Sequence, residues 1–130
     1  MKRSMLVLIL ISMAGCSGSK NEVENINKAL TTMLKFEEAL AVYRFDVSTF
    51  PASSEGLGAL TKAPKSATNW NGPYYEGEIP LDPWGNPYLY EHGAEIYQIL
   101  SAGPDGDLGS DDDLVTKRTI ESDEPVEPTP

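Results

Sequence analysis

Apolar side chains recur at every third or fourth position through the first half of the chain. This spacing places them on one face of an α-helix. Alanines in the stretch favour a helix, and neither Gly nor Pro interrupts it. The pattern predicts one helix over residues 22–46, ending before Pro51, with an apolar face that the rest of the chain must cover. The residues of this face are Val23, Ile26, Leu30, Met33, Phe36, Leu40, Tyr43 and Val47.

A second, much shorter helix is predicted between residues 51 and 64. Ser53 and Ser54 are of a residue type that caps helix N-termini, and with Glu55 they stand just before Leu57 and Leu60. Such residues followed by apolar positions three apart predict a short capped helix under a loop.

Residues 65–87 are rich in Pro, Gly, Asn and aromatic side chains. A loop of this length in a compact domain needs side chains that hold it down. Trp and Tyr bury large areas while keeping one polar contact. We therefore predict that Trp70, Tyr74, Tyr75 and Trp84 pin the loop to the core.

Three β-strands are predicted in the second half of the chain, over residues 88–90, 96–100 and 114–120. A turn at His92-Gly93 joins the first two. One helix followed by a small antiparallel sheet is an α+β arrangement, in which the apolar helix face lies on the sheet. A length of 130 residues allows one such domain, over residues 22–120.

The N-terminus has the pattern of a secretory signal. Lys2 and Arg3 precede an apolar run over residues 5–13, which is shorter than the roughly 20 residues that a membrane-spanning helix needs. A basic start, a short apolar run and small residues before the cleavage point are typical of a leader that is removed. The predicted leader covers residues 1–15.

The small pair Ala14-Gly15 directly before a lone cysteine resembles the lipobox of bacterial lipoproteins. This resemblance implies cleavage before Cys16, acylation of its thiol and a polar tether over residues 16–21. It also implies anchoring on the periplasmic or surface side of a bacterial membrane, and Ser17 after the cysteine favours the outer membrane. The alternative is an ordinary signal peptide with a chance cysteine near its end.

Composition excludes several classes of function. The chain has 20 acidic and 10 basic residues and a formal charge of −10, which disfavours nucleic acid because phosphate binding needs Lys and Arg. One Cys cannot form an internal disulfide, and one Cys with one His excludes a conventional zinc site. Residues 121–130 hold three Pro and four acidic residues, which predicts a disordered acidic tail.

An acidic segment lies between the second and third predicted strands, with five carboxylates in the nine residues from Asp105 to Asp113. These charges would repel one another in a folded turn unless a cation neutralised them. Calcium suits such a loop because it takes six to eight oxygen ligands at about 2.3–2.6 Å, whereas magnesium requires a tight octahedron. Asp105 and Asp112 stand where they can close the loop from its two ends.

An EF-hand is excluded because its sixth position would be Ser110 in place of Gly and its twelfth Thr116 in place of Glu. The flanking segments are also predicted strands, not helices. The remaining alternative to a calcium site is a solvated acidic turn that holds no specific ion.

Several segments, taken in order, resemble the major pseudopilin of bacterial type II secretion systems, the G-type subunit. The most specific is Asp-Pro-Trp-Gly-Asn-Pro-Tyr at residues 82–88. The resemblance covers about residues 40–115. Its segments are Tyr43-Arg44-Phe45-Asp46, Phe50-Pro51, residues 54–60, 69–74 and 82–88, and Ser101-Ala102-Gly103-Pro104-Asp105-Gly106.

The resemblance implies a pilin-like α+β fold, with a long N-terminal helix packed on a small antiparallel sheet and a calcium ion held by the loop between the last strands. By position, Asp105 and Asp112 would be the principal carboxylate ligands. The Ala102 carbonyl, Ser110 and Asp113 would complete the shell, and Asp111 is a further candidate.

One departure from the family changes the functional expectation. Members begin with a prepilin leader cut before an apolar helix that sits in the inner membrane and polymerises. Here the chain is polar where the predicted helix begins, with Lys20 and Asn21 just before it and Glu22 and Glu24 in its first turn. We therefore expect a non-enzymatic, membrane-anchored, calcium-stabilised pseudopilin-like lipoprotein that interacts with type II secretion or pilus-like machinery.

Two alternatives stay open at this point. One is an atypical pseudopilus subunit of type II protein secretion. The other is a metal-dependent hydrolase, which is disfavoured because His92 is the only histidine and neither a Gly-x-Ser-x-Gly nor a His-Glu-x-x-His motif occurs.

Overall fold

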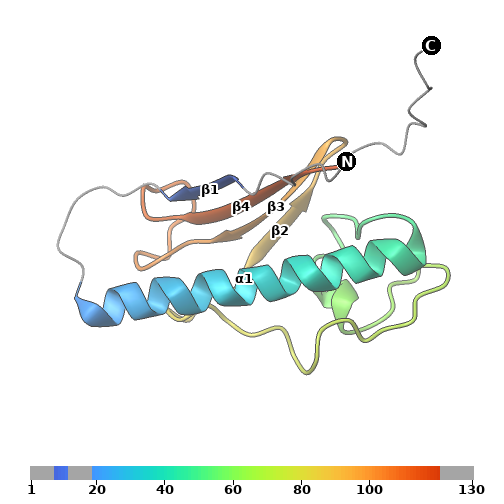
Figure 1. Ribbon diagram of the computed structural model, residues 1–130, viewed down its shortest axis with the longest axis horizontal. Helices are drawn as coiled ribbons and strands as arrows, with labels where there is room; N and C mark the ends of the chain where they lie inside the picture. The colour runs from blue at the N-terminus through green and yellow to red at the C-terminus, as the bar shows by residue number, and fades with distance from the viewer. Residues whose placement is uncertain (1–7, 12–18, 121–130) are drawn as a thin grey trace, which may run out of the picture.

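The computed structural model describes residues 8–11 and 19–120 (Figure 1). A long helix runs along a small sheet in which all neighbouring strands are antiparallel, in the order β1-β4-β3-β2. The predicted α+β architecture, a long helix on a small antiparallel sheet, is confirmed. The elements are β1 (Leu8–Ile11), α1 (Lys20–Val47), the 3₁₀ helix η1 (Leu57–Leu60), β2 (Leu89–His92), β3 (Ile96–Ser101) and β4 (Leu114–Thr119).

Strand β1 lies inside the predicted leader, where the sequence analysis expected no part of the fold. It pairs with β4, with Leu8 opposite Lys117 and Ile11 opposite Leu114. A short apolar segment suits a strand position as well as a leader, so its pattern alone does not distinguish the two. The rest of the predicted leader, the lipidation candidate Cys16 and the predicted acidic tail over 121–130 lie outside the described residues.

Helix α1 is longer than predicted by two residues at its start and one at its end. It begins at Lys20, within the predicted tether, and the left-handed Ser48 ends it by donating its N–H to the Arg44 carbonyl at 2.8 Å. The predicted apolar face is buried from Met33 onward, Ile26 and Leu30 are half-buried, and Val23 is 53 % exposed. The first turns of α1 therefore extend beyond the core.

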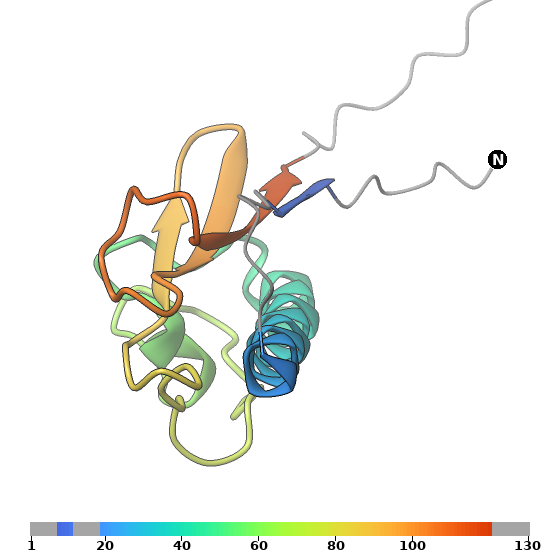
Figure 2. The same ribbon diagram turned by 90° about the vertical axis from the view of Figure 1, so that its left-hand side faces the viewer.

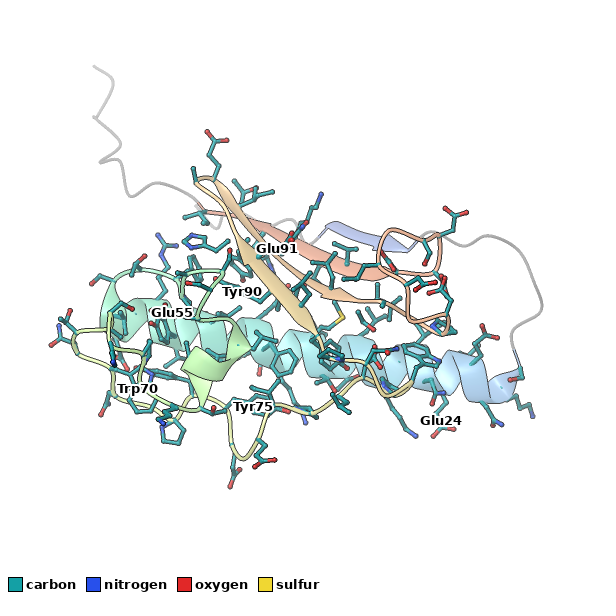
Figure 3. The ribbon with its side chains drawn as sticks, turned by 180° about the vertical axis from the view of Figure 1, so that it is seen from behind. Glu24, Glu55, Trp70, Tyr75, Tyr90 and Glu91 are labelled. Carbon is teal, nitrogen blue, oxygen red and sulfur yellow. The ribbon has the colours of Figure 1, made fainter. Side chains whose placement is uncertain are left out.

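The sheet is not the only part of the fold that covers α1. The loop between η1 and β2 runs along the helix (Figure 1). It presents aromatic rings to the helix, among them that of Tyr75 (Figure 3). The ring of Phe36 lies 5.0 Å from that of Tyr75 and 5.2 Å from that of Tyr88, and Tyr43 lies 5.5 Å from Tyr74. The prediction that aromatic side chains pin this loop to the core is confirmed.

The short helix was predicted in the right place with the wrong cap. Leu57 and Leu60 are buried as expected, but η1 follows Gly56, whose φ is +60°, and has no side-chain cap. Glu55 accepts the Ala52 N–H at 2.9 Å, so it stabilises the preceding turn. Ser53 exchanges hydrogen bonds with the backbone of His92 on β2, which is why it does not cap the helix.

Strand register fixes where the acidic loop leaves the sheet. The predicted strands are confirmed to within one or two residues, and Ser101 at the end of β3 pairs with Leu114 at the start of β4. A buried ion pair ties β4 to the helix, with the Arg118 Nε donating to the Glu37 Oε2 at 2.6 Å. The pair spans 81 positions of the chain.

The two phenylalanines of α1 provide a matched test of this packing. Phe36 is fully buried, whereas Phe45 is 86 % exposed. We expect Phe36→Ala to lower the free energy of unfolding by about 3–5 kcal/mol and Phe45→Ala to change it by less than about 0.5 kcal/mol. Urea denaturation measures both, and equal losses would contradict the assignment of the buried face.

Candidate metal centre

The acidic loop, residues 102–113, connects β3 to β4 at the end of the molecule where α1 begins (Figures 1 and 2). Because β3 and β4 pair up to Ser101 and Leu114, the two ends of the loop are held together. The antiparallel ladder therefore brings its first and last residues to one place before any side chain contributes.

Asp112 is the centre of the hydrogen bonds within the loop. Its Oδ2 accepts the backbone N–H of Asp105 at 3.2 Å, and its Oδ1 accepts the Ser110 hydroxyl at 2.5 Å. The Ser110 oxygen also lies 3.4 Å from Oδ1 of Asp113, whose Oδ2 accepts the Gly109 N–H at 2.7 Å. Four predicted ligand residues, Asp105, Ser110, Asp112 and Asp113, thus share one network.

The surroundings of Asp112 favour its charged form. The hydrogen bond from the Ser110 hydroxyl, aided by the backbone N–H of Asp105, holds the pKa of the Asp112 carboxyl below its usual value. An ionised carboxylate is the form that a hard cation requires.

Gly103 allows the two arms of the loop to meet. Its φ is +66°, and a Cβ at this position would lie 2.3 Å from the backbone oxygen of Asp112, a separation that no side chain tolerates. Ala102, whose carbonyl is a predicted ligand, is buried directly before it. The close approach at Gly103 therefore sets the Ala102 side of the loop against Asp112.

The side chains of two aspartates of the loop make no hydrogen bond in this network. Asp111, a predicted candidate ligand, is exposed and takes no part in the network around Asp112. Asp107 donates its backbone N–H to Asp105 at 2.9 Å and is exposed. Within residues 8–11 and 19–120, no three His, Cys, Asp or Glu residues are grouped to hold a metal.

A calcium site here therefore depends on mixed oxygen donors. The Asp112 carboxylate, the Ser110 hydroxyl beside it and the Ala102 carbonyl are hard ligands of the kind that calcium binds. The carboxylates of Asp105 and Asp113 are further ligands of this kind, and they would have to move closer to Asp112 to bind the same ion. The residues that the loop gathers around Asp112 fit this chemistry, and the ligand set stays a prediction.

A turn over residues 82–86 supports the start of the loop, a position that its sequence motif does not indicate. Asp82 is buried, and its Oδ1 accepts the N–H groups of Trp84 at 3.1 Å and Asn86 at 2.8 Å. Its Oδ2 accepts the hydroxyl of the buried Ser101 at 2.7 Å. The turn has a local sequence signal, because an Asp often accepts the N–H groups of residues a few positions after it. No local signal indicates the contact between Asp82 and Ser101.

His92 lies far from the acidic loop. It pairs with Tyr97 at the start of β3, whereas the loop follows Ser101 at its other end, about 13 Å away along the strand. The only histidine of the chain is thus not placed to act with a metal in this loop.

The fold has a solved counterpart among the pseudopilins. The crystal structure of the major pseudopilin from the type 2 secretion system of enterohaemorrhagic Escherichia coli superposes with a TM-score of 0.67 at 25 % sequence identity, over 79 % of this chain and 91 % of that one. Helix, sheet and connecting loops together therefore define a pseudopilin-like protein.

Sequence comparisons name the family. Type II secretion system core protein G of Escherichia coli (strain K12) is 37 % identical over 115 residues, which are 83 % of this chain and 77 % of that protein. The protein of the same name from Aeromonas hydrophila is 32 % identical over 114 residues, or 83 % and 78 %. A family model described as type II secretion system (T2SS), protein G, matches residues 18–118. The chain belongs to this family, as its sequence motifs predicted.

The role of Gly103 can be tested against a second glycine of the same loop. Both have positive φ, but a Cβ at Gly109 meets nothing within 4 Å. We expect Gly109→Ala to cost about 1–2 kcal/mol through backbone strain alone and Gly103→Ala about 1–3 kcal/mol more, because the loop arms must separate. Equilibrium unfolding of the two variants measures the difference, and equal stabilities would contradict the close approach.

Proposed function

We propose that this protein is a calcium-stabilised, membrane-anchored lipoprotein of the pseudopilin type that acts with proteins of the type II secretion system and catalyses no reaction. Membership of the protein G family supports the link to secretion. The observation that carries the calcium proposal is that the Asp105 N–H and the Ser110 hydroxyl both donate to the Asp112 carboxylate, while the same Ser110 oxygen lies 3.4 Å from Asp113.

Charge repulsion gives the ion its role in this proposal. Asp111, Asp112 and Asp113 are consecutive, and no basic side chain forms an ion pair with them among the described residues. Bound calcium neutralises the cluster and joins the two arms of the loop. Extracellular calcium modules bind at about 10⁻⁴–10⁻³ M, so a site of this class would fill outside the cytoplasm.

The anchor proposal combines the lipobox with the beginning of α1. Cys16 stands only a few residues before Lys20, where the helix starts with polar side chains. In the described part of the chain, no helix combines the length and apolar character needed to cross a bilayer. A lipid on Cys16 would supply the attachment, with the outer membrane as the favoured destination.

An atypical pseudopilus subunit is the second candidate function. The relatives carry the name type II secretion system core protein G. This name favours a subunit of the secretion machinery itself. The two candidates differ in the chemistry of the mature N-terminus. The hydrolase alternative gains no support from the position of His92.

Calcium should raise the melting temperature of the mature protein. At free calcium ten times the Kd, linkage adds about 1.4 kcal/mol, or roughly 6–11 °C for a domain of this size. Asp112→Asn should abolish the shift, whereas Asp107→Asn, an equal change of charge in the same loop, should keep it. Differential scanning calorimetry in calcium and in EDTA measures the shift, and identical wild-type melts in the two would refute the proposed role of the ion.

Lipidation should be visible in the mass of the mature protein. We expect the wild type to begin at an acylated Cys16 and to sediment with membranes, and Cys16→Ser to lack the acyl mass and leave the membrane fraction. Intact-mass spectrometry after detergent extraction reads both forms. An N-methylated first residue with no acyl group would instead identify an atypical pseudopilus subunit.

A further inference from the structure

The buried carboxylate of Asp82 has a partner that its own turn does not account for. One oxygen closes the turn by accepting the N–H groups of Trp84 and Asn86. The other leaves the turn and accepts the hydroxyl of Ser101 at 2.7 Å, 19 residues further along the chain. Asp82 is 4 % exposed and Ser101 is fully buried, so water does not compete for this bond.

Ser101 links Asp82 to the acidic loop through hydrogen bonds. It is the last residue of β3, and its oxygen also accepts the backbone N–H of Gly103 at 3.4 Å. The hydroxyl therefore holds the chain on both sides of Ala102. Fixing Ser101 and Gly103 fixes the peptide group between them, including the Ala102 carbonyl.

The same turn supports the loop at a second point. The amide group of Asn86 lies 3.2 Å from the position that a Cβ on Gly106 would occupy. Asn86 is itself held by its N–H on Asp82 and by its carbonyl oxygen, which accepts the Asp82 N–H at 2.8 Å. The turn thus contacts the first arm of the loop, from Ser101 to Gly106. Asp112 lies on the second arm.

We propose that Asp82 is a positioning residue for the metal centre, because its hydrogen bond to Ser101 sets the Ala102 carbonyl and the first arm of the loop in place for the cation. This inference rests on the proposed calcium function. Asp82 acts through Ser101, because its Oδ1 accepts two N–H groups of its own turn and its Oδ2 accepts the Ser101 hydroxyl. Its effect is to reduce the ordering that the loop must undergo when the ion binds.

A double-mutant cycle tests the proposal. Asp82→Asn and Ser101→Ala should each weaken calcium binding by about 10- to 100-fold, as loss of a group that orients a metal ligand typically does. Because both remove the same link, the double variant should bind about as weakly as the weaker single variant, not with the product of the two losses. Isothermal titration calorimetry of the mature protein, well below its melting temperature, gives the dissociation constants.

A matched control separates positioning from general stability. Tyr90 is buried on β2, and its hydroxyl donates to the Pro51 carbonyl at 3.0 Å, a contact that does not touch the loop. Tyr90→Phe should lower the melting temperature in EDTA and leave the calcium dissociation constant unchanged. Should Asp82→Asn fail to fold, Ser101→Ala alone carries the measurement.

Each outcome has a distinct meaning. Weakened, non-additive binding in the Asp82 and Ser101 variants supports the proposal. If the wild type binds calcium and the dissociation constants of both variants lie within twofold of its own, the positioning role is overturned. The proposed calcium function then stays intact. Absence of binding heat for the wild type overturns the calcium function and the positioning role with it.

Discussion

A single long helix with one apolar face imposes the main constraint on this fold. Helix α1 has 28 residues, and a helix of that length spans about 42 Å, while β2, β3 and β4 have only four to six residues each. Such strands cannot cover the whole face. The loop between η1 and β2 therefore has to pack its aromatic rings against Phe36 and Tyr43.

This second layer gives the irregular segments a structural role equal to that of the sheet. The segment that ends with Tyr88 on the helix also contains the turn at Asp82, which meets the acidic loop at Ser101. Helix packing and loop geometry are in this way coupled through one stretch of chain with few regular backbone hydrogen bonds. The coupling explains how a loop crowded with like charges acquires a defined path.

Periodic features of the fold were predictable from the sequence, and contacts between distant residues were not. The three- and four-residue spacing from Val23 to Val47 predicted α1, and the strands predicted over residues 88–90, 96–100 and 114–120 correspond to β2, β3 and β4, with ends that differ by at most two residues. The ion pair of Glu37 with Arg118 has no local signature, since each residue looks like an ordinary surface charge. Ser53 illustrates the opposite error, because its residue type suggests a cap while its hydroxyl contacts β2.

The candidate site was predictable in composition and less so in geometry. Clustered Asp and Gly residues indicated the loop, and family motifs indicated Asp105 and Asp112. The central place of Asp112 depends on which carboxylate the Ser110 hydroxyl and Asp105 N–H reach, and the exposure of Asp111 depends on the direction of the chain there. Neither follows from residue type, because neighbouring aspartates are equivalent until the backbone is placed.

Strand β4 has a neighbour on each side because β1 occupies one of them. If cleavage before Cys16 removes residues 8–11, the backbone groups on that side of β4 lose their partners and the sheet gains an open edge. Open edges promote association between molecules, and charged side chains limit it. Lys117, exposed on β4, provides such a charge. In the processed protein Lys117 would therefore lie on an open edge, where its charge disfavours pairing with the strand of another molecule.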